Sequence, residues 1–307
     1  MKVDNFALTN FQTCPGKYDL RIRQGWTTRR RSSALGFGSA FHEGIAVWYK
    51  TGDLAAALTA IVKSWDETVS VDDYRTKEKC IQVMIDYVKR YPSESFTVVG
   101  APEHPMIEVP FTLDTGMTIS WCAQGTCLLD SETQHTCSNC GKPLEPIEYG
   151  GIFDGLVDFN GQLWVFEHKT TSQLGSYYFN QFKPNNQVTG YIWAAEQLSG
   201  RKVNGAIINA IGVFKTGVTR FERSMTARHA NEISEWMENV RIVCNQIKRA
   251  EREGFSLSTN ACTLYGQCEY HSVHVLSHPA ERQKRLEQDY MVDAWDFEKR
   301  TGTEVKP

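Results

Sequence analysis

The stretch GGIFDGLVDFNGQLWVFEHKTT, residues 150–171, decides how the middle of this chain folds. It holds two runs rich in β-branched and aromatic residues, and the pair Asn160-Gly161 separates them. An Asn-Gly pair between two such runs is typical of a tight β-hairpin. The sequence therefore predicts two antiparallel strands here, although these strands carry charged residues that a half-buried hairpin does not need.

Those charges form a pattern on the predicted hairpin. In a strand, side chains two residues apart share a face, so Glu167 and Lys169 point the same way while His168 points to the other side. An acid from the first strand then meets Glu167 on one face, and two neighbouring carboxylates repel each other unless a cation joins them. One interpretation is a Mg²⁺ or Mn²⁺ site of the kind that hydrolyses phosphodiesters, with Lys169 beside the attacking water. The alternative is a set of solvent-facing charges on an edge strand.

The rest of the chain alternates helical and strand patterns. Apolar spacing predicts helices over residues 34–50, 53–66, 73–91, 180–198 and 227–253, and strands over 104–116, 204–214 and 219–225. The first third is therefore expected to be mostly helical, with the strands after it. The charged segment after His278 could form a helix or a mobile arm.

Length and charge limit the class of protein. A chain of 307 residues is long enough for one large domain or two modest ones. A net charge of −3 excludes a generally basic DNA-coating protein, but it leaves room for a local basic groove. One basic segment, RIRQGWTTRRR (residues 21–31), combines five arginines with Trp26, a composition that suits phosphates and stacked bases, or a solvated loop.

The sequence does not predict a membrane protein. No run approaches the roughly 18 apolar residues that a spanning helix requires, and the N-terminal residues lack the apolar stretch of a secretory signal. A cytoplasmic location is therefore expected. Nine cysteines in such a chain argue against a disulfide framework and favour metal binding.

Four of the cysteines lie close together in the middle of the chain. Cys122 and Cys127 form one pair, and Cys137 and Cys140 form a C-x2-C pair followed by glycine, as in a zinc knuckle. This spacing predicts a structural Zn²⁺ site, with His135 as a substitute ligand. The insertion, residues 120–143, is expected to be a zinc ribbon that guides a DNA strand or docks a partner protein.

Five motifs, in order along the chain, resemble those of the RecB-type branch of the PD-(D/E)XK nucleases. They are Cys14-Pro15 in LTNFQTCPGKYDLRIR, His42 in LGFGSAFHEGI, Asp154 in GIFDG, Glu167 and Lys169 in FEHKTT, and Gln187 and Tyr191 in NNQVTGYIWAA. That branch includes CRISPR-associated RecB-like exonucleases and stand-alone phage exonucleases. Gln187 and Tyr191 are one helical turn apart, so a helix places them on one face.

The resemblance implies an α/β fold with a restriction-endonuclease-like core, that is, a mixed central sheet flanked by helices. A helical N-terminal part and the inserted zinc ribbon complete the expected architecture. Residues 1–307 would form a single RecB-like nuclease domain, with residues 275–307 as a charged C-terminal tail.

The resemblance also implies roles for individual residues. Asp154, rather than Asp158, would hold the catalytic metal together with His42, Glu167 and the backbone carbonyl of His168. The nitrogen ligand favours Mn²⁺ over Mg²⁺ somewhat. Lys169 would act beside the metal, Gln187 and Tyr191 would contact DNA near the scissile phosphate, and Glu108 is weighed only as an outer acid.

A second metal site is implied near the two ends of the chain. Nucleases of this type often join their N- and C-terminal segments through an iron-sulfur cluster, for which Cys14, Cys262 and Cys268 are available, with His274 at the fourth position. Three thiolates and one imidazole suit Zn²⁺ as well as a [4Fe-4S] cluster, and His271 is a rival ligand. The alternative is that these are simply reduced cysteines.

The predicted function is a metal-dependent DNA exonuclease. It would hydrolyse phosphodiester bonds at linear or single-stranded DNA ends in recombination, repair or phage DNA processing, with a recombination or replication protein as a possible partner. The alternatives are a non-catalytic DNA-end-binding module with structural metals, and an RNA-directed nuclease. The intact set of Asp154, Glu167 and Lys169 favours a catalyst.

Overall fold

The structure is a computed structural model that describes residues 1–30, 32–67, 74–122, 125–126, 136–137, 140–263 and 266–296, with only the backbone at 121, 122, 125 and 126. The chain forms two compact units. Unit one comprises Met1–Arg29, Phe111–Gly151 and Ser234–Pro307; unit two comprises Arg30–Pro110 and Ile152–Ile233. None of the helices within the described ranges combines the length and apolar character that crossing a membrane requires.

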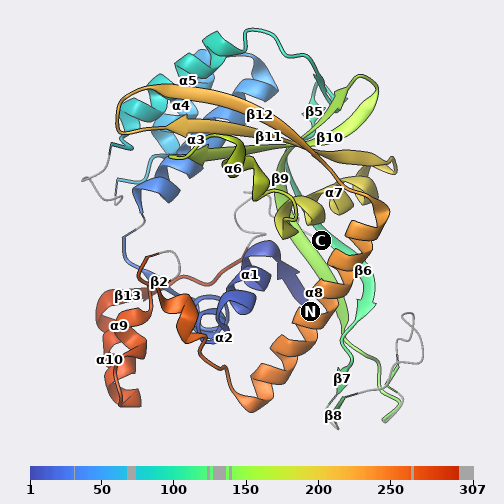
Figure 1. The fold of residues 1–307 in the computed structure, drawn as a ribbon, viewed down its shortest axis with the longest axis vertical. Coiled ribbons are helices and arrows are strands. Elements are labelled where there is room, and N and C mark those ends of the chain that lie inside the picture. Colours follow the sequence, from blue (N-terminus) through green and yellow to red (C-terminus); the bar gives the residue numbers. More distant parts are fainter. Residues whose placement is uncertain are drawn as a thin grey trace. The chain divides into compact units, whose positions relative to one another are not determined.

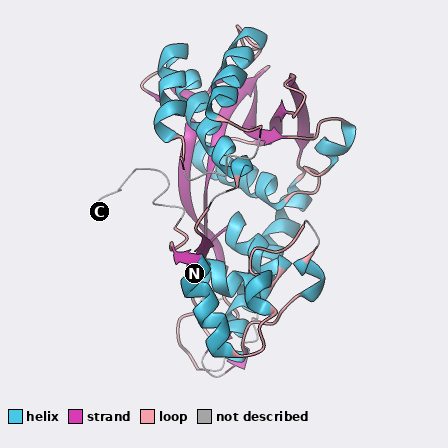
Figure 2. Cartoon of the chain, turned by 90° about the vertical axis from the view of Figure 1, so that its left-hand side faces the viewer, coloured by secondary structure: helices cyan, strands magenta, loops and turns pink. Residues whose placement is uncertain are grey.

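Unit two is built on a mixed sheet. Its main strands follow the order β9 (Pro146–Phe159), β10 (Gln162–Thr171), β11 (Val203–Val213) and β12 (Thr219–Ala227). The pairs β9–β10 and β11–β12 are antiparallel, whereas β10–β11 is parallel. A parallel pair needs a crossover, and helix α7 (Asn186–Ser199) supplies it (Figure 1). The predicted mixed sheet flanked by helices is confirmed, with the strands lying among helices (Figure 2).

The Asn-Gly turn forms as the sequence predicts. Asn160 has φ 53° and Gly161 has φ 78°, and two positive φ values in succession are what a tight two-residue hairpin turn requires. The Gly161 N–H donates to the Asp158 carboxylate at 2.8 Å. Asp158 is therefore occupied with the turn, away from the other acids of the hairpin.

Three helices of unit two enclose a hydrophobic core: α3 (Ser33–Thr51), α4 (Leu54–Ser64) and α5 (Lys77–Arg90). Each begins at a side-chain cap, provided by Ser32, Asp53 and Thr76, respectively. Gly44 permits close packing of α3 on α4, because a Cβ there would lie 2.5 Å from Ile61 Cγ1.

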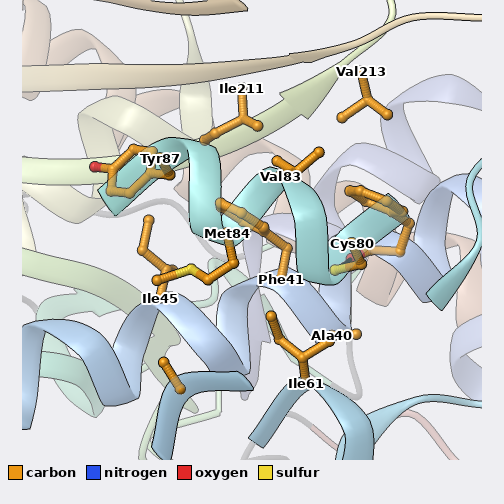
Figure 3. Close-up of a cluster of buried hydrophobic side chains, with 12 residues drawn as sticks. Ala40, Phe41, Ile45, Ile61, Cys80, Val83, Met84, Tyr87, Ile211 and Val213 are labelled. Carbon is orange, nitrogen blue, oxygen red and sulfur yellow. Dashed lines mark hydrogen bonds between the residues drawn. The ribbon is translucent and has the colours of Figure 1, made fainter. Parts of the chain in front are cut away.

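The core between these helices and the sheet is fully buried. Figure 3 shows side chains from α3, α4, α5 and β11 pointing toward one another. The labelled members are Ala40, Phe41, Ile45, Ile61, Cys80, Val83, Met84, Tyr87, Ile211 and Val213. This packing fixes α3, the helix that carries His42, against the strand face.

The helix predicted over residues 180–198 is two helices in the structure, α6 (Ser176–Asn180) and α7. Proline disfavours helical geometry in the residue before it, so the chain leaves the helix around Pro184. Asn185 then caps α7 by accepting the Val188 N–H at 3.0 Å. The predicted start of this helix was therefore wrong by six residues.

Unit one contains the N-terminal segment and the long helix near the end of the chain. Strand β1 (Lys2–Asp4) pairs in parallel with residues 148–150 of β9. After it come α1 (Asn5–Thr13), α2 (Pro15–Tyr18) and a π-helix (Asp19–Arg23). The main C-terminal helix is α8 (Ala230–Glu253), close to the predicted 227–253.

The described part of the charged tail forms secondary structure. It contains α10 (Pro279–Asp289) and β13 (Tyr290–Val292), which pairs with β2 (Trp26–Thr28), and the short helix α9 (His271–His274) precedes it. The remaining elements are β3 (Thr97–Val98), β4 (Gly100–Ala101), β5 (His104–Pro105), β6 (Ile107–Thr118), β7 (Trp121–Cys122), β8 (Gly125–Thr126) and a 3-10 helix (Thr259–Cys262). The expected helix after His278 therefore exists, and residues 297–307 lie outside the described ranges.

Three arginines of the basic segment bond to other residues of unit one. Arg21 is buried and donates to the Asp293 carbonyl at 3.0 Å. Arg23 pairs with Asp19 at 2.6 Å, and Arg29 donates to two backbone carbonyls, those of residues 287 and 288. Each of these three guanidinium groups therefore already has a partner within unit one.

We expect Phe41→Ala to lower the free energy of unfolding by about 3–5 kcal/mol, because it leaves a cavity in the core of unit two. Phe41 is fully buried, whereas Val62 on α4 is half exposed. Val62→Ala is the control and should cost less than about 1 kcal/mol. Urea denaturation measures both, and equal costs for the two variants would contradict the assigned core.

Candidate active site

The two acids of the hairpin lie where its ladder ends. The last paired residues of β9 and β10 are Gly155 and Phe166, so the next pair along the hairpin is Asp154 and Glu167. Directly opposed residues of antiparallel strands place their side chains on the same face. The Asp154 Oδ2 accepts the His168 N–H at 2.6 Å, so a side chain replaces the backbone partner at the point where β9 leaves the ladder.

Helix α3 brings an imidazole to the same place. His42 Nδ1 lies 3.2 Å from Asp154 Oδ1 and 3.8 Å from Glu108 Oε1. The ligand atoms of these three residues all lie within 4.8 Å of one another. Within the described ranges of the chain, this is the only such group of three or more histidine, cysteine or acidic donors. It is the candidate site for a metal ion.

Glu108 contributes more than the sequence suggested. It was weighed as an outer acid, but the structure places its carboxylate in the candidate ligand group. Its φ is 51°, in the left-handed region that residues other than glycine rarely adopt. Backbone strain of this kind persists where surrounding structure enforces it, often at functional sites. No sequence pattern signals a positive φ at a glutamate.

Two carboxylate oxygens at the site have no hydrogen-bond partner among the described residues. They are Glu108 Oε1 and Glu167 Oε2, and both atoms are buried. A buried carboxylate oxygen is costly unless a donor or a cation satisfies it. Oxygen ligands with one imidazole nitrogen suit Mg²⁺ or Mn²⁺. The residues present therefore fit a divalent cation.

The lysine of the hairpin is held by hydrogen bonds from two elements. Lys169 Nζ donates to Glu167 Oε1 at 2.7 Å and to Gln187 Oε1 at 3.0 Å. Gln187 Nε2 donates in turn to the Tyr191 hydroxyl at 3.2 Å, one turn along α7. Both ends of the Gln187 amide are engaged, so this residue orients the lysine from the opposite element.

The pKa values of Glu167 and Asp154 are shifted in opposite directions. Burial raises the pKa of Glu167 to about 7, and the Asp154 carboxylate adds to this effect. Burial also acts to raise the pKa of Asp154, but His42 and other positive groups outweigh it and lower that pKa to about 2. Asp154 is therefore ionised at neutral pH, whereas Glu167 is near its midpoint when no cation is bound.

The two basic groups are stabilised in their charged forms. Burial acts to lower the pKa of His42, but Asp154 and Glu108 raise it well above 6.5. Burial likewise opposes the charge of Lys169, and Glu167 and Asp154 raise its pKa overall. Without a cation, the positive charges of protonated His42 and Lys169 thus compensate for the negative charges of the acids. A metal bound to His42 must displace the imidazolium proton.

A buried network holds the His168 ring on the other face of β10. Asn209 Oδ1 accepts from Arg223 Nε at 3.1 Å, and arginine can only donate. The Asn209 amide nitrogen therefore faces His168 Nδ1 at 2.8 Å and the Tyr87 hydroxyl at 3.0 Å. Arg223 also forms two bonds, of 2.6 and 2.8 Å, with the Glu94 carboxylate.

This network fixes the state of His168. Because Nδ1 accepts a hydrogen bond, the ring is neutral and carries its proton on the other nitrogen. Burial lowers the pKa of His168 to about 3, which agrees with this state. Tyr49 stacks on the ring, with centroids 5.7 Å apart. The sequence reasoning missed Asn209 and Arg223, which belong to β11 and β12 and form no motif with the hairpin.

The terminal cysteine set is not brought together around a single ion. Cys14 is buried, and its Sγ accepts the Ser258 N–H at 3.4 Å. The Cys268 N–H donates to the Cys262 carbonyl at 2.8 Å. All four expected ligands, including His274, are described, and they form no group of three donors within 4.8 Å. The site therefore stays a prediction.

Half of the middle cysteine set is described. Cys137 N–H donates to the Lys142 carbonyl, and Gly141 N–H donates to the Cys137 carbonyl, each at 2.8 Å. Gly141 has φ 68°, so the C-x2-C pair with Cys140 lies on a tight turn. Cys127 and His135 lie outside the described residues, as does the Cys122 side chain. The zinc site remains a prediction.

We expect the affinity for Mn²⁺ to rise with pH. Below about pH 7 Glu167 binds a proton and His42 is an imidazolium, so the cation must displace protons from its ligands. One displaced proton changes the affinity by about tenfold per pH unit. Calorimetric titration with Mn²⁺ at about pH 6 and about pH 8 measures this dependence.

Asp158→Asn is the matched control, because Asp158 lies on the same hairpin but bonds to the turn. It should leave both the affinity and its pH dependence unchanged, whereas Glu167→Gln should weaken binding and flatten the dependence near pH 7. Equal affinity of the natural protein at both pH values would contradict the prediction that Glu167 and His42 lose protons when Mn²⁺ binds.

We expect Asn209→Leu to lower the free energy of unfolding by about 2 kcal/mol or more, because it leaves buried polar groups of Arg223 and His168 without a partner. Asn204→Leu, on the same strand, is the control. Its side chain has no hydrogen-bond partner in the described parts of the chain. Urea denaturation compares the two variants. If Asn209→Leu is as stable as Asn204→Leu, the network does not stabilise the fold.

Comparisons with known proteins concern the family and the fold of this chain. A model of the PD-(D/E)XK nuclease superfamily matches residues 6–273. A solved structure from Eubacterium rectale, described as "Putative exonuclease", matches with a TM-score of 0.50 and 13% identity, covering 90% of this chain and 89% of that chain. At this identity the likeness concerns the fold alone.

A second solved structure, described as that of SSO0001, matches with a TM-score of 0.27 and 11% identity over 78% of this chain and 84% of that chain, and carries no weight here. No curated protein matches. The family model spans most of the sequence and includes His42, Asp154, Glu167 and Lys169. This chain belongs to the PD-(D/E)XK nuclease superfamily.

Proposed function

We propose that this protein is a metal-dependent DNA exonuclease that acts at linear or single-stranded ends, in recombination, repair or phage DNA processing. Membership of the nuclease superfamily gives the coarser part, which is hydrolysis of a nucleic acid. The observation that carries the proposal is the convergence of His42, Glu108 and Asp154 beside the buried Glu167 and the Lys169 ammonium. The cytoplasmic location expected from the sequence stays part of this proposal.

The proposed ligands of the cation are His42, Asp154, Glu167 and the His168 carbonyl, with Glu108 added by the structure. The N–H and C=O of one strand residue point to the same neighbouring strand. Because the His168 N–H faces Asp154, its carbonyl belongs to that same edge, where β9 no longer pairs. This geometry supports the carbonyl as a ligand.

A bound Mg²⁺ or Mn²⁺ would polarise a phosphoryl oxygen and lower the pKa of an attacking water. The protein's own residues supply orientation and charge. Lys169, held between Glu167 and Gln187, would orient the water or offset the negative charge that develops on the phosphorus oxygens. Tyr191, at the end of the same hydrogen-bond chain, is proposed to contact DNA near the scissile phosphate.

The two cysteine sets are proposed as structural metal sites. The turn at Cys137 and Cys140 supports Zn²⁺ in the insertion, with Cys122 and Cys127 as the other ligands. Cys14, Cys262, Cys268 and His274 are proposed to hold a [4Fe-4S] cluster or a second Zn²⁺, supported by the burial of the Cys14 thiol against the backbone of Ser258. A partner protein in recombination or replication remains a proposal.

We expect Glu167→Ala to reduce the degradation of an end-labelled linear DNA strand in Mn²⁺ by at least about 100-fold, because it removes a proposed metal ligand and the partner of Lys169. DNA binding should persist. Asp158→Ala, on the same hairpin, is the control and should remain active. Gel electrophoresis measures the products, and filter binding measures the affinity.

Four outcomes would contradict parts of the proposal. Undiminished activity of Glu167→Ala would end the catalytic assignment. Cleavage of circular single-stranded DNA as fast as linear DNA would exclude an exonuclease. Degradation of RNA alone would favour the RNA-directed alternative, and DNA binding without any cleavage would favour the end-binding module.

A further inference from the structure

The segment that links the catalytic strand to α7 has an unusual composition. From Thr170 to Ala195 the chain contains no aspartate or glutamate, although acids make up 36 of its 307 residues. The same segment holds four closely spaced aromatic residues, Tyr177, Tyr178, Phe179 and Phe182, and six side-chain amides between residues 173 and 187. The absence of acids, together with the presence of aromatic rings and amides, suits contact with a polyanion that carries flat bases.

Helix α6 presents one of these rings to solvent. Tyr177 is 89% exposed, the most exposed of the large hydrophobic side chains in the described part of the chain. Its neighbour Tyr178 is half-buried and packs edge-on against Phe179 and Phe182, with centroids 5.4 and 5.5 Å away. Tyr177 therefore projects from a packed element.

A buried arginine fixes the end of this segment. Arg228 donates to the Phe182 carbonyl and, at 2.9 Å, to Thr189 Oγ1 on α7. It is only 4% exposed, so this contact is part of the interior of unit two. The segment is thereby tied to α7, the helix that carries Gln187. The position of Tyr177 is thus determined by the same elements as the catalytic site.

The segment also lies close to the catalytic lysine. Burial raises the pKa of Tyr178, and the Lys169 ammonium and the Thr171 side chain act against this rise. The Tyr178 hydroxyl in turn contributes to raising the pKa of Lys169. Tyr178, the residue next to Tyr177 in the chain, therefore lies near Lys169, on the strand that also carries Glu167.

We propose that Tyr177 is a nucleobase-stacking site that receives one unpaired base of the strand whose phosphate lies at Lys169. The inference rests on the proposed nuclease function and narrows its substrate to strands with an unpaired end. A base in a blunt duplex is stacked on its neighbour and cannot lie flat on this ring without being unpaired first. Because the segment has no acids of its own, it adds no repulsion of the phosphates on either side.

Binding of a short single strand in Ca²⁺, with Ca²⁺ in place of the proposed catalytic cation, tests this site. The probes are oligothymidylates with 2-aminopurine at the 5′ or the 3′ terminal base, whose fluorescence falls on stacking. Tyr177→Ala should weaken binding about tenfold and abolish the fluorescence change for one of the two probes. Tyr177→Phe and Tyr177→Trp should retain both, because they keep a flat ring.

Leu198→Ala, which trims a partly exposed apolar residue at the other end of α7, is the matched control and should bind like the natural protein. Circular dichroism verifies that each variant is folded. Unchanged affinity and fluorescence in Tyr177→Ala would overturn the stacking site. Equal losses of affinity for blunt duplex and for single strand would overturn the preference for an unpaired base.

Failure of this inference is distinguishable from failure of the proposed function. If Glu167→Ala degrades DNA as fast as the natural protein, the catalytic assignment fails whatever Tyr177→Ala does to binding. If Glu167→Ala is inactive while Tyr177→Ala binds normally, the nuclease assignment stands and the stacking site alone is wrong.

Discussion

The site depends on one hydrogen bond, from the His168 N–H to the Asp154 carboxylate. It forms where β9 stops pairing with β10, so a side chain takes over the place of a backbone carbonyl. The bond turns the acid of one strand toward the backbone of the other. It also opens an edge of β10 to the imidazole of His42, which reaches the same carboxylate from α3. Sheet, helix and cation site therefore meet at a break in a hairpin ladder.

Both faces of β10 support that arrangement. On one face, Lys169 is held by Glu167 and by Gln187 of α7. On the other, the His168 ring is held by Asn209, whose amide is oriented by Arg223. Polar networks of this kind hold a strand in place only when every member is satisfied. Among the acids of the site, Glu108 Oε1 and Glu167 Oε2 have no hydrogen-bond partner in the described residues, which is where a cation would be needed.

Much of the site could be predicted because its signals are local. The Asn-Gly turn sets the register, and the register alone places Asp154 and Glu167 side by side. Ordered motifs supplied His42 and Gln187. The positive φ of Glu108 could not be predicted, because residues other than glycine rarely adopt it and the sequence carries no signal for it.

Other features depend on contacts between distant segments. Asn209 belongs to the network only because β11 runs parallel to β10 in one register, and Arg223 only because β12 pairs with β11. Arg21 and Arg29 belong to a segment whose composition suits phosphates, yet they bond to the carbonyls of residues 287, 288 and 293. The sequence shows where the arginines are, but it does not show which distant groups they bond to in the folded chain.

The most direct measurement of the central claim is a crystal structure of the protein soaked in Mn²⁺, with an anomalous difference map collected near the manganese edge. The account predicts one strong peak bonded to His42 and Asp154, together with a carboxylate oxygen of Glu108 or Glu167. A map without a peak there, or with His42 and Asp154 turned away from each other, would contradict it.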